Sequence, residues 1–141
     1  MDNVPRFKTA RLTCPQCGEH STEIMPEDAA RVMIPVLREL TVERFYVLVL
    51  DAMNGLKTCE QVTTGTLNAS LVHPREVFKQ AIDHRAASII VVHNHPSGNP
   101  EPSREDVEIT RQLAEAGKVL GIPLHDHIIV ALDRFTSLAE R

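Results

Sequence analysis

Two kinds of hydrophobic pattern divide this chain into expected helices and expected strands. In the first kind, apolar residues recur every three or four positions, as in helices with one buried face. These segments are 26–40, 74–85 and 104–120. In the second kind, β-branched and other apolar residues follow one another without a break, as in strands covered on both faces. These segments are 45–50, 88–92 and 127–132. Because the two kinds alternate, the sequence predicts a mixed α/β fold with a central sheet flanked by helices.

Turn signals and helix breakers refine this order. The Asp-Ala-Met-Asn-Gly run at 51–55 ends the first strand, and its Asn-Gly pair predicts a hairpin to a second strand over roughly 56–64. Residues 135–138 are expected to add a short edge strand. Pro35 falls within the first helical pattern and predicts a kink or a division there. Gly117 and Gly121 are candidate ends of the last helix.

Residues 1–25 show neither pattern and are predicted to form a polar arm, followed by one domain over 26–141. The arm carries Cys14 and Cys17 in a Cys-x-x-Cys spacing. Two thiolates do not close a zinc site, and a redox pair is expected in a βαβ unit, so free surface thiols are the favoured interpretation. Cys59 lies in an expected strand, where we interpret it as a small core residue.

The composition argues against several classes of protein. The 141 residues are 43% hydrophobic and 24% charged, which is ordinary for a globular domain. The net charge of −4, with one Tyr and no Trp, argues against a cationic or stacking surface for nucleic acid. No apolar run is long enough to cross a membrane, and the N-terminus lacks the apolar core of a signal peptide. We therefore expect a cytoplasmic protein, while its oligomeric state is not indicated.

Seven histidines are the less ordinary part of the composition, and two of them, His93 and His95, lie at the end of the strand over 88–92. Alternate residues of a strand point to one side, so both imidazoles can face one point. A proline-rich loop then leads to a helix whose first turn contains Asp106. Two imidazoles and a carboxylate leave a fourth position open, which is the ligand count of a catalytic zinc. From these residues alone, Asp106 could equally be a helix-capping acid, and the histidines could be solvated.

The run HNHPSGNPEPSRED over 93–106 resembles the JAMM signature of MPN+ metalloproteases, which is His-x-His, seven residues and then Ser-x-x-Asp. With GTLNASLVHPREVFKQAI over 65–82 and LGIPLHDHIIV over 120–130, the chain is more similar still to the JAB domain of RadC-like proteins. The resemblance covers most of the chain, from about residue 26 to its end. It implies an MPN/JAB-like fold, whose architecture is cytidine-deaminase-like, and one zinc ion per chain.

The resemblance also implies roles for individual residues. His93, His95 and Asp106 would be the zinc ligands, and the hydroxyl of Ser103 would steady the oxyanion of the substrate. Asp126 and His127 match the Asp-His-Ile-Ile-Val run of the family, and we expect them to form hydrogen bonds beneath the site.

The family uses a glutamate just before a core strand as general base on the zinc-bound water, and Glu43, ahead of 45–50, occupies that place. Chemistry also requires a carboxylate to take the proton of the water and return it to the leaving amine. Glu43 could instead be a solvated acid. Glu76, in the first turn of a helix, is the second candidate for the base, although acids there usually complement the helix dipole.

Two departures bear on the function that the resemblance implies. Position 94 is Asn where many JAMM enzymes carry Ser or Thr, and Asn94 is expected to point away from the metal. RadC-like proteins of full length carry an N-terminal helix-hairpin-helix associated with duplex DNA, whereas only some twenty-five residues precede the matched region here. A nucleic-acid partner is therefore expected only by family association.

The leading hypothesis is a zinc-dependent hydrolase of the JAMM type, a metallopeptidase or isopeptidase that cleaves an amide bond in a protein or peptide substrate. The alternative is a RadC-like metal-binding module that acts in DNA-related processes or as a non-catalytic protein-binding scaffold. A zinc deaminase or nuclease ranks third, because the deaminase signature with Pro-Cys-x-x-Cys is absent.

Overall fold

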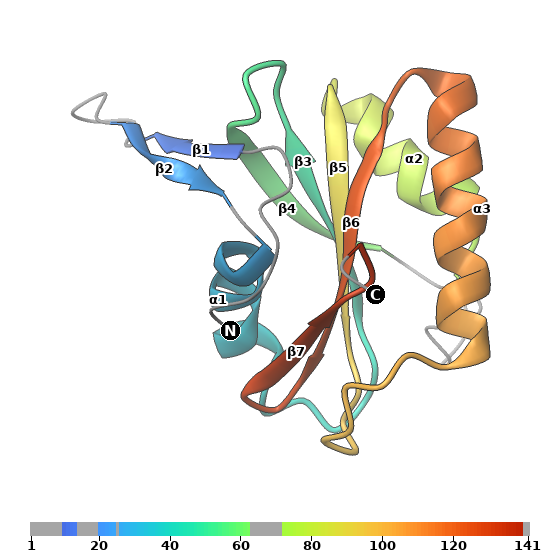
Figure 1. The fold of residues 1–141 in the computed structure, drawn as a ribbon. Helices are drawn as coiled ribbons and strands as arrows, with labels where there is room; N and C mark the ends of the chain where they lie inside the picture. The colour runs from blue at the N-terminus through green and yellow to red at the C-terminus, as the bar shows by residue number, and fades with distance from the viewer. Residues whose placement is uncertain (1–9, 14–19, 25, 63–71, 140–141) are drawn as a thin grey trace.

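A five-stranded sheet forms the centre of the fold, and helices cover both of its faces (Figure 1). A computed structural model describes residues 10–13, 20–24, 26–62 and 72–139. In chain order, these residues form β1 (Ala10–Thr13), β2 (His20–Ile24), α1 (Pro26–Leu37), β3 (Phe45–Leu50), β4 (Leu56–Val62), α2 (Pro74–Asp83), β5 (Ser88–Asn94), α3 (Arg104–Leu120), β6 (Leu124–Ala131) and β7 (Arg134–Ser137). The mixed α/β class predicted from the hydrophobic pattern is confirmed.

The sheet has the strand order β4-β3-β5-β6-β7. β5 and β6 are parallel and are joined through α3, whereas all other neighbouring strands are antiparallel. Phe45, the first residue of β3, pairs with His93 near the end of β5. The segment that enters β3 and the segment that leaves β5 therefore lie at the same end of the sheet.

Alternation along the strands divides the core into two layers. Side chains such as Val47, Ile89 and Val91 pack between the sheet and the two helices α2 and α3. Their neighbours Leu48 and Ile90 face the opposite way and pack against α1. Every residue of β5 is buried, which explains the unbroken apolar run of residues 89–92 within this strand. Continued alternation predicts that His93 and Asn94 leave the sheet on opposite faces.

Helix α3 has well-defined ends. Gly121 follows its last residue in a left-handed conformation, with φ of 74°, which favours glycine at this position. Gly117 was the other candidate for the helix end, but it lies inside α3. A Cβ atom at this position would collide with the Ile122 carbonyl oxygen, so Gly117 allows close packing of the helix on the chain that follows it.

The helix over 26–40 is shorter than predicted, and it is not divided. α1 ends at Leu37, and Pro35 lies in its last turn. Pro35 is exposed, and beside it the Arg38 N–H still donates to the carbonyl of Ile34 at 2.8 Å. The proline therefore removes one hydrogen bond near the end of the helix and does not divide it.

The polar arm predicted for residues 1–25 contains two strands that the sequence pattern did not predict. These strands, β1 and β2, pair antiparallel. Short strands can pair through their backbones and need no long apolar pattern. Cys14 and Cys17 lie outside the described residues. Cys59 lies in β4, half-buried, with its Sγ 3.4 Å from Sδ of Met33, and burial raises its pKa to about 11.

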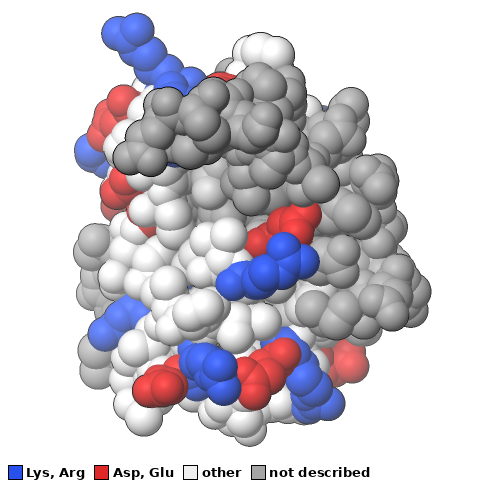
Figure 2. Space-filling view, turned by 90° about the vertical axis from the view of Figure 1, so that its left-hand side faces the viewer, with Lys and Arg blue, Asp and Glu red and all other residues white. Residues whose placement is uncertain are grey.

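Charges on the face that carries α1 are of mixed sign. Arg31 pairs with Asp28 within α1, and Arg38 pairs with Asp133 in the turn between β6 and β7. Figure 2 shows basic and acidic side chains interspersed over the described part of this face. None of the helices in the described residues is long and apolar enough to span a membrane.

Candidate metal centre

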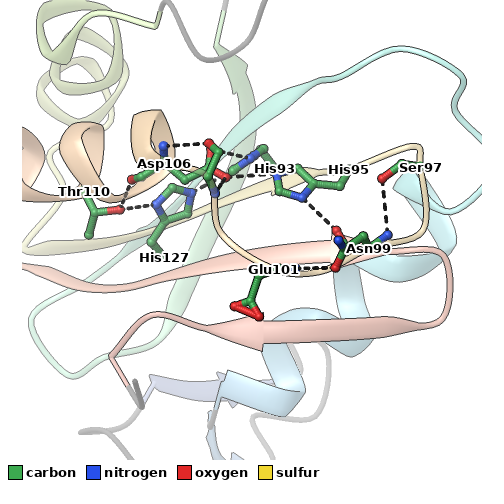
Figure 3. A network of polar contacts seen from close by, with 9 residues as sticks. His93, His95, Ser97, Asn99, Glu101, Asp106, Thr110 and His127 are labelled. Atoms are coloured by element: carbon green, nitrogen blue, oxygen red, sulfur yellow. Dashed lines mark hydrogen bonds and ion pairs between the residues drawn. The ribbon is translucent and has the colours of Figure 1, made fainter.

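His93, His95 and Asp106 meet at the end of β5 that lies beside the start of α3 (Figure 3). His93 belongs to β5, and His95 follows the strand directly, so both side chains point to the α3 side of the sheet. Asp106 lies in the first turn of α3. The backbone N–H of His95 donates to the carbonyl of Val130 at 2.8 Å, which keeps this residue aligned with β6 after β5 has ended.

The three side chains offer their polar atoms to one small space. Nε2 of His93 lies 3.1 Å from Oδ1 of Asp106, and Nε2 of His95 lies 3.0 Å from Oδ2. One ligand atom from each residue lies within 4.8 Å of the other two, so the cluster could hold a metal ion. His93 is only 2% exposed, and Asp106 is also buried, whereas the His95 side chain is 15% exposed. Solvent therefore reaches the cluster from the His95 side.

Asp106 is oriented by the start of its own helix. The Ser103 N–H donates to Oδ2 of Asp106 at 2.8 Å, and the Asp106 N–H donates to Oγ of Ser103 at 3.0 Å. This reciprocal pair is a capping box. Helix capping and participation in the cluster are thus not alternatives for Asp106, because the same carboxylate does both.

Beneath the cluster, His127 links His93 to α3. Its Nε2 lies 2.9 Å from Nδ1 of His93, and its Nδ1 lies 2.6 Å from Oγ1 of Thr110. His127 is completely buried, and burial lowers its pKa well below the usual range, so its ring is neutral and carries one N–H. Phe45 stacks on His93 with ring centroids 5.6 Å apart and closes this side of the cluster.

The direction of each hydrogen bond follows from counting protons. The Thr110 hydroxyl donates to the backbone carbonyl of Asp106 at 2.6 Å, because a carbonyl can only accept. Thr110 must then accept from Nδ1–H of His127, and neutral His127 must accept at Nε2 from Nδ1–H of His93. Nε2 of His93, when that ring is neutral, therefore carries a lone pair that faces the cluster. This atom is buried and has no hydrogen-bond partner among the described residues.

His95 is oriented in a similar way. Its Nδ1 donates to the carbonyl of Asn99 at 2.9 Å, so the neutral ring also points a lone pair from Nε2 toward Asp106. Two nitrogen lone pairs and a carboxylate that face one another repel unless a proton or a cation lies between them. The donor set thus fits a divalent cation, and His93 Nε2 is the buried polar atom that such an ion would satisfy.

The ionisation of Asp106 and His95 reflects the same arrangement. Burial alone would raise the pKa of Asp106, but the nearby imidazoles of His93 and His95 hold it well below its usual range. The hydrogen bond to Asp106 raises the pKa of His95, and the charge of Glu43 contributes in the same direction. Without a metal, this raised pKa favours a proton on His95 in the place of the cation.

A cleft of about 410 Å³ opens beside the cluster. The described residues that line it are Glu43, His95, Pro96, Ser97, Ser103, Glu105 and Asp106. Glu43 and Ser103 therefore border the same cleft as two of the three clustered residues. Ser103 is exposed, and its oxygen accepts the Asp106 N–H, which does not use its own hydroxyl hydrogen. Glu76 lies in α2, 3.7 Å from the Arg75 guanidinium, and is not among the described lining residues.

Several contributors to the site were not found from the sequence. Thr110 is four residues after Asp106, on the same side of α3, and that spacing is the signal that could have identified it. Asn99 and Phe45 carry no comparable signal, because a backbone carbonyl and an apolar ring act here through tertiary position alone. The expected hydrogen bond of His127 beneath the site is present. Asp126 also forms hydrogen bonds there, because its Oδ1 accepts from the backbone N–H of His127 at 2.7 Å, and its carboxylate also accepts from the Ser137 hydroxyl and the Ala139 N–H.

Comparison with known proteins places the fold and the cluster in a family context. The model of the RadC-like JAB domain matches residues 24–141. A UPF0758 protein of Caldanaerobacter subterraneus is 48% identical over 93% of this chain and 56% of its own length. UPF0758 proteins of Salinibacter ruber and Methanosarcina mazei are 56% and 51% identical, over 89% and 82% of this chain and 54% and 50% of their own lengths. The chain thus spans about half the length of the curated relatives that it matches.

The stability of the metal-free protein should depend on pH through His95 and Asp106. The lowered pKa of Asp106 contributes stability above about pH 3.9, which is lost as pH falls through the lowered value. The raised pKa of His95 contributes stability below about pH 6.5, which is lost as pH rises through the raised value. The joint contribution of Asp106 and His95 to the free energy of unfolding should therefore be complete between about pH 4 and 6.5, and it should be lost as pH rises through the raised pKa of His95.

Urea unfolding of chelator-treated protein measures this effect. The difference in free energy of unfolding between wild type and His95→Gln should shrink by about 1–2 kcal/mol from pH 6 to pH 8.5. A difference that does not change with pH would contradict the proposed proton between His95 and Asp106.

Thr110 should affect metal affinity through His127 and His93. Thr110→Val keeps the shape of the side chain but removes the acceptor for Nδ1–H of His127, so the ring of His93 loses its fixed tautomer. We expect affinity for Zn²⁺ or Co²⁺, measured by competition with a chromophoric chelator, to fall about 10- to 100-fold. Thr110→Ser retains the hydroxyl and should stay within a few-fold of wild type. Equal affinities for the valine and serine variants would show that the hydroxyl does not orient the ligand.

Proposed function

Because this chain belongs to the RadC-like JAB domain family, we propose that it is a zinc-dependent hydrolase that cleaves an amide bond in a protein or peptide. Its substrates would include isopeptides. The observation that carries this proposal is the convergence of three lone-pair donors, from His93, His95 and Asp106, beside a cleft that holds a further carboxylate. The fold is that of a JAB/MPN domain, and the cluster could hold a metal ion. The identity of the metal as zinc and the hydrolytic activity are the parts that we propose.

The donor set suits zinc better than calcium or magnesium. Two imidazole nitrogens and one carboxylate are usual ligands of catalytic zinc, whereas calcium and magnesium prefer oxygen. When bound, zinc would lower the pKa of a water ligand to about 7 and polarise the carbonyl of the substrate. His95 is the most exposed of the three side chains, so the open coordination position would face the cleft.

Glu43 and Ser103 are the two residues that we propose act directly on the substrate. The Glu43 carboxylate borders the cleft and would take a proton from the attacking water and deliver it to the leaving amine. The Ser103 hydroxyl would donate a hydrogen bond to the oxyanion that develops on the attacked carbonyl. Its capping bond with Asp106 fixes the position of this hydroxyl relative to the cluster.

The charge of the cleft favours an amide over a phosphodiester substrate. Glu43 and Glu105 add two carboxylates to that of Asp106, and none of the described lining residues is a Lys or Arg. Even with the +2 charge of a bound zinc ion, the three carboxylates leave a net charge of −1, so a nucleic-acid backbone would bring further negative charge into this space, which costs electrostatic energy. An amide is neutral, and its leaving amine becomes cationic, so the acids stabilise the products of amide cleavage.

Zinc content tests the proposed metal site. Protein purified without chelator should contain about one zinc ion per chain at this site, because the three residues form one open site. His93→Ala/His95→Ala should reduce this to background, measured by elemental analysis. The measurement is best made on a Cys14→Ser/Cys17→Ser background, so that those thiols do not contribute zinc. His84→Ala, which lies outside the cluster, is the matched control. Stoichiometric zinc that persists in the double histidine variant would exclude this site.

Glu43→Gln tests the proposed base. With zinc retained, hydrolysis of a panel of peptides and isopeptides should fall at least about 100-fold, because an amide cannot accept the proton of the water. Glu76→Gln is the matched control and should remain close to wild type. The assignment is wrong if Glu43→Gln keeps full activity. If wild type binds zinc but hydrolyses no member of the panel, the metal-binding module without catalysis becomes the better description.

A further inference from the structure

Asn94 lies between the two clustered histidines, but its side chain works on the opposite face of the sheet. It is 2% exposed, and its Oδ1 accepts a hydrogen bond from the backbone N–H of Arg44 at 2.6 Å. Its Nδ2 donates to the backbone carbonyl of Val42 at 3.0 Å. One side-chain amide thus holds the residue before and the residue after Glu43.

The segment that contains Glu43 has few other described ties to the fold. Residues 41–44 precede β3 and do not belong to the sheet ladder, which begins with the pairing of Phe45 and His93. Val42 is 44% exposed, so packing does not fix it. Among the described residues, this segment has one further side-chain hydrogen bond, from the Arg44 guanidinium to the carbonyl of Glu43 at 3.3 Å, and it lies within the segment. The two bonds to Asn94 therefore provide the connection to β5.

We propose that Asn94 is a positioning residue, which places the carboxylate of Glu43 over the metal cleft by fixing the backbone on both sides of it. This inference rests on the proposed function, since it takes Glu43 as the base. We call the two hydrogen bonds of the Asn94 side chain the clamp. Because Asn94 stands between His93 and His95 in the chain, the clamp ties the segment of Glu43 to the same strand end that carries the two histidines. A displacement of the strand end would carry the histidines and Glu43 together, and their separation would be maintained.

A catalytic group must be held close to its working position, since a displacement of about 1 Å can cost about 100-fold in rate. A carboxylate on an untethered loop would meet that requirement only part of the time. The two bonds of Asn94 restrain different groups, because one holds the N–H of Arg44 and the other holds the C=O of Val42, on either side of Glu43. Together they restrict both rotation and translation of this short segment.

Amide hydrogen exchange tests the clamp directly and needs no substrate. In zinc-loaded Asn94→Ala, exchange at the Arg44 amide should become about tenfold faster, because its hydrogen bond to Asn94 is lost. The amides of His93 and His95 and the zinc content should not change. The matched control is Asn54→Gly, which removes an asparagine side chain in the turn at the other end of β3, where φ of 63° suits glycine. If Asn94→Ala does not fold, Asn94→Ser replaces it.

Kinetics test whether the clamp acts through Glu43. With a peptide or isopeptide that wild type hydrolyses, Asn94→Ala should lower kcat about 10- to 100-fold and leave KM within about twofold. Adding Asn94→Ala to Glu43→Gln should cause no further loss, because the group that Asn94 positions is already inactive. A merely structural role would lower the activity of both backgrounds by the same factor.

The outcomes separate this inference from the proposed function. Unchanged exchange at Arg44 overturns the inference, whatever the activity. Faster exchange with unchanged kcat overturns it also, provided that Glu43→Gln is impaired. If wild type hydrolyses nothing, the proposed function fails, and exchange at Arg44 alone decides whether Asn94 holds the segment.

Discussion

Two imidazole lone pairs and one buried carboxylate point toward one another, and the other features of this site depend on the electrostatic repulsion between them. Nε2 of His93 and Nε2 of His95 each lie near 3 Å from an oxygen of Asp106. Such an arrangement is stable only with positive charge between the donors, either a proton or a metal ion. The surrounding hydrogen bonds support this arrangement, because each one keeps a nitrogen or oxygen donor atom pointed toward the centre of the cluster.

Each donor is held by a different kind of support. Asp106 is held by the capping box of α3, and His95 by the carbonyl of Asn99. His93 is held by a chain of hydrogen bonds that runs through His127 and Thr110 back to the backbone of Asp106. This chain closes a loop, since the residue that supplies the carboxylate also anchors the support of the opposing imidazole. A shift of α3 would therefore disturb two donors together, which links the packing of the helix to the geometry of the cluster.

The family assignment and the geometry support different parts of the functional conclusion. Membership in the RadC-like JAB domain family rests on a match over 24–141 and on relatives about half identical to this chain. Since the chain spans about half the length of those relatives, the activity of this domain is proposed from its own geometry. The cleft beside the cluster and the clamp on Glu43 belong to this domain itself. They are the features that make a hydrolytic role chemically reasonable for the domain taken alone.

The elements of the central sheet and the members of the cluster could be predicted from the amino-acid sequence. The apolar run at 45–50 and the capped helix at 104–120 match β3 and α3 residue for residue, because long or unbroken hydrophobic patterns reflect burial. The spacing of His93, His95 and Asp106 allowed them to meet, since strand alternation and a helix start are local geometry, and the resemblance to the JAMM signature favoured that grouping over the alternatives. The strands of the N-terminal arm were not predicted, because β1 and β2 depend on backbone pairing that leaves no strong hydrophobic pattern in the sequence. The connections that support the site came from the tertiary structure. The resemblance indicated His127, but its bonds to His93 and Thr110, and those of Asn94 to the segment before β3, join residues 17 to 52 positions apart along the chain. Such contacts arise from the way strands and helices pack, which no local pattern encodes.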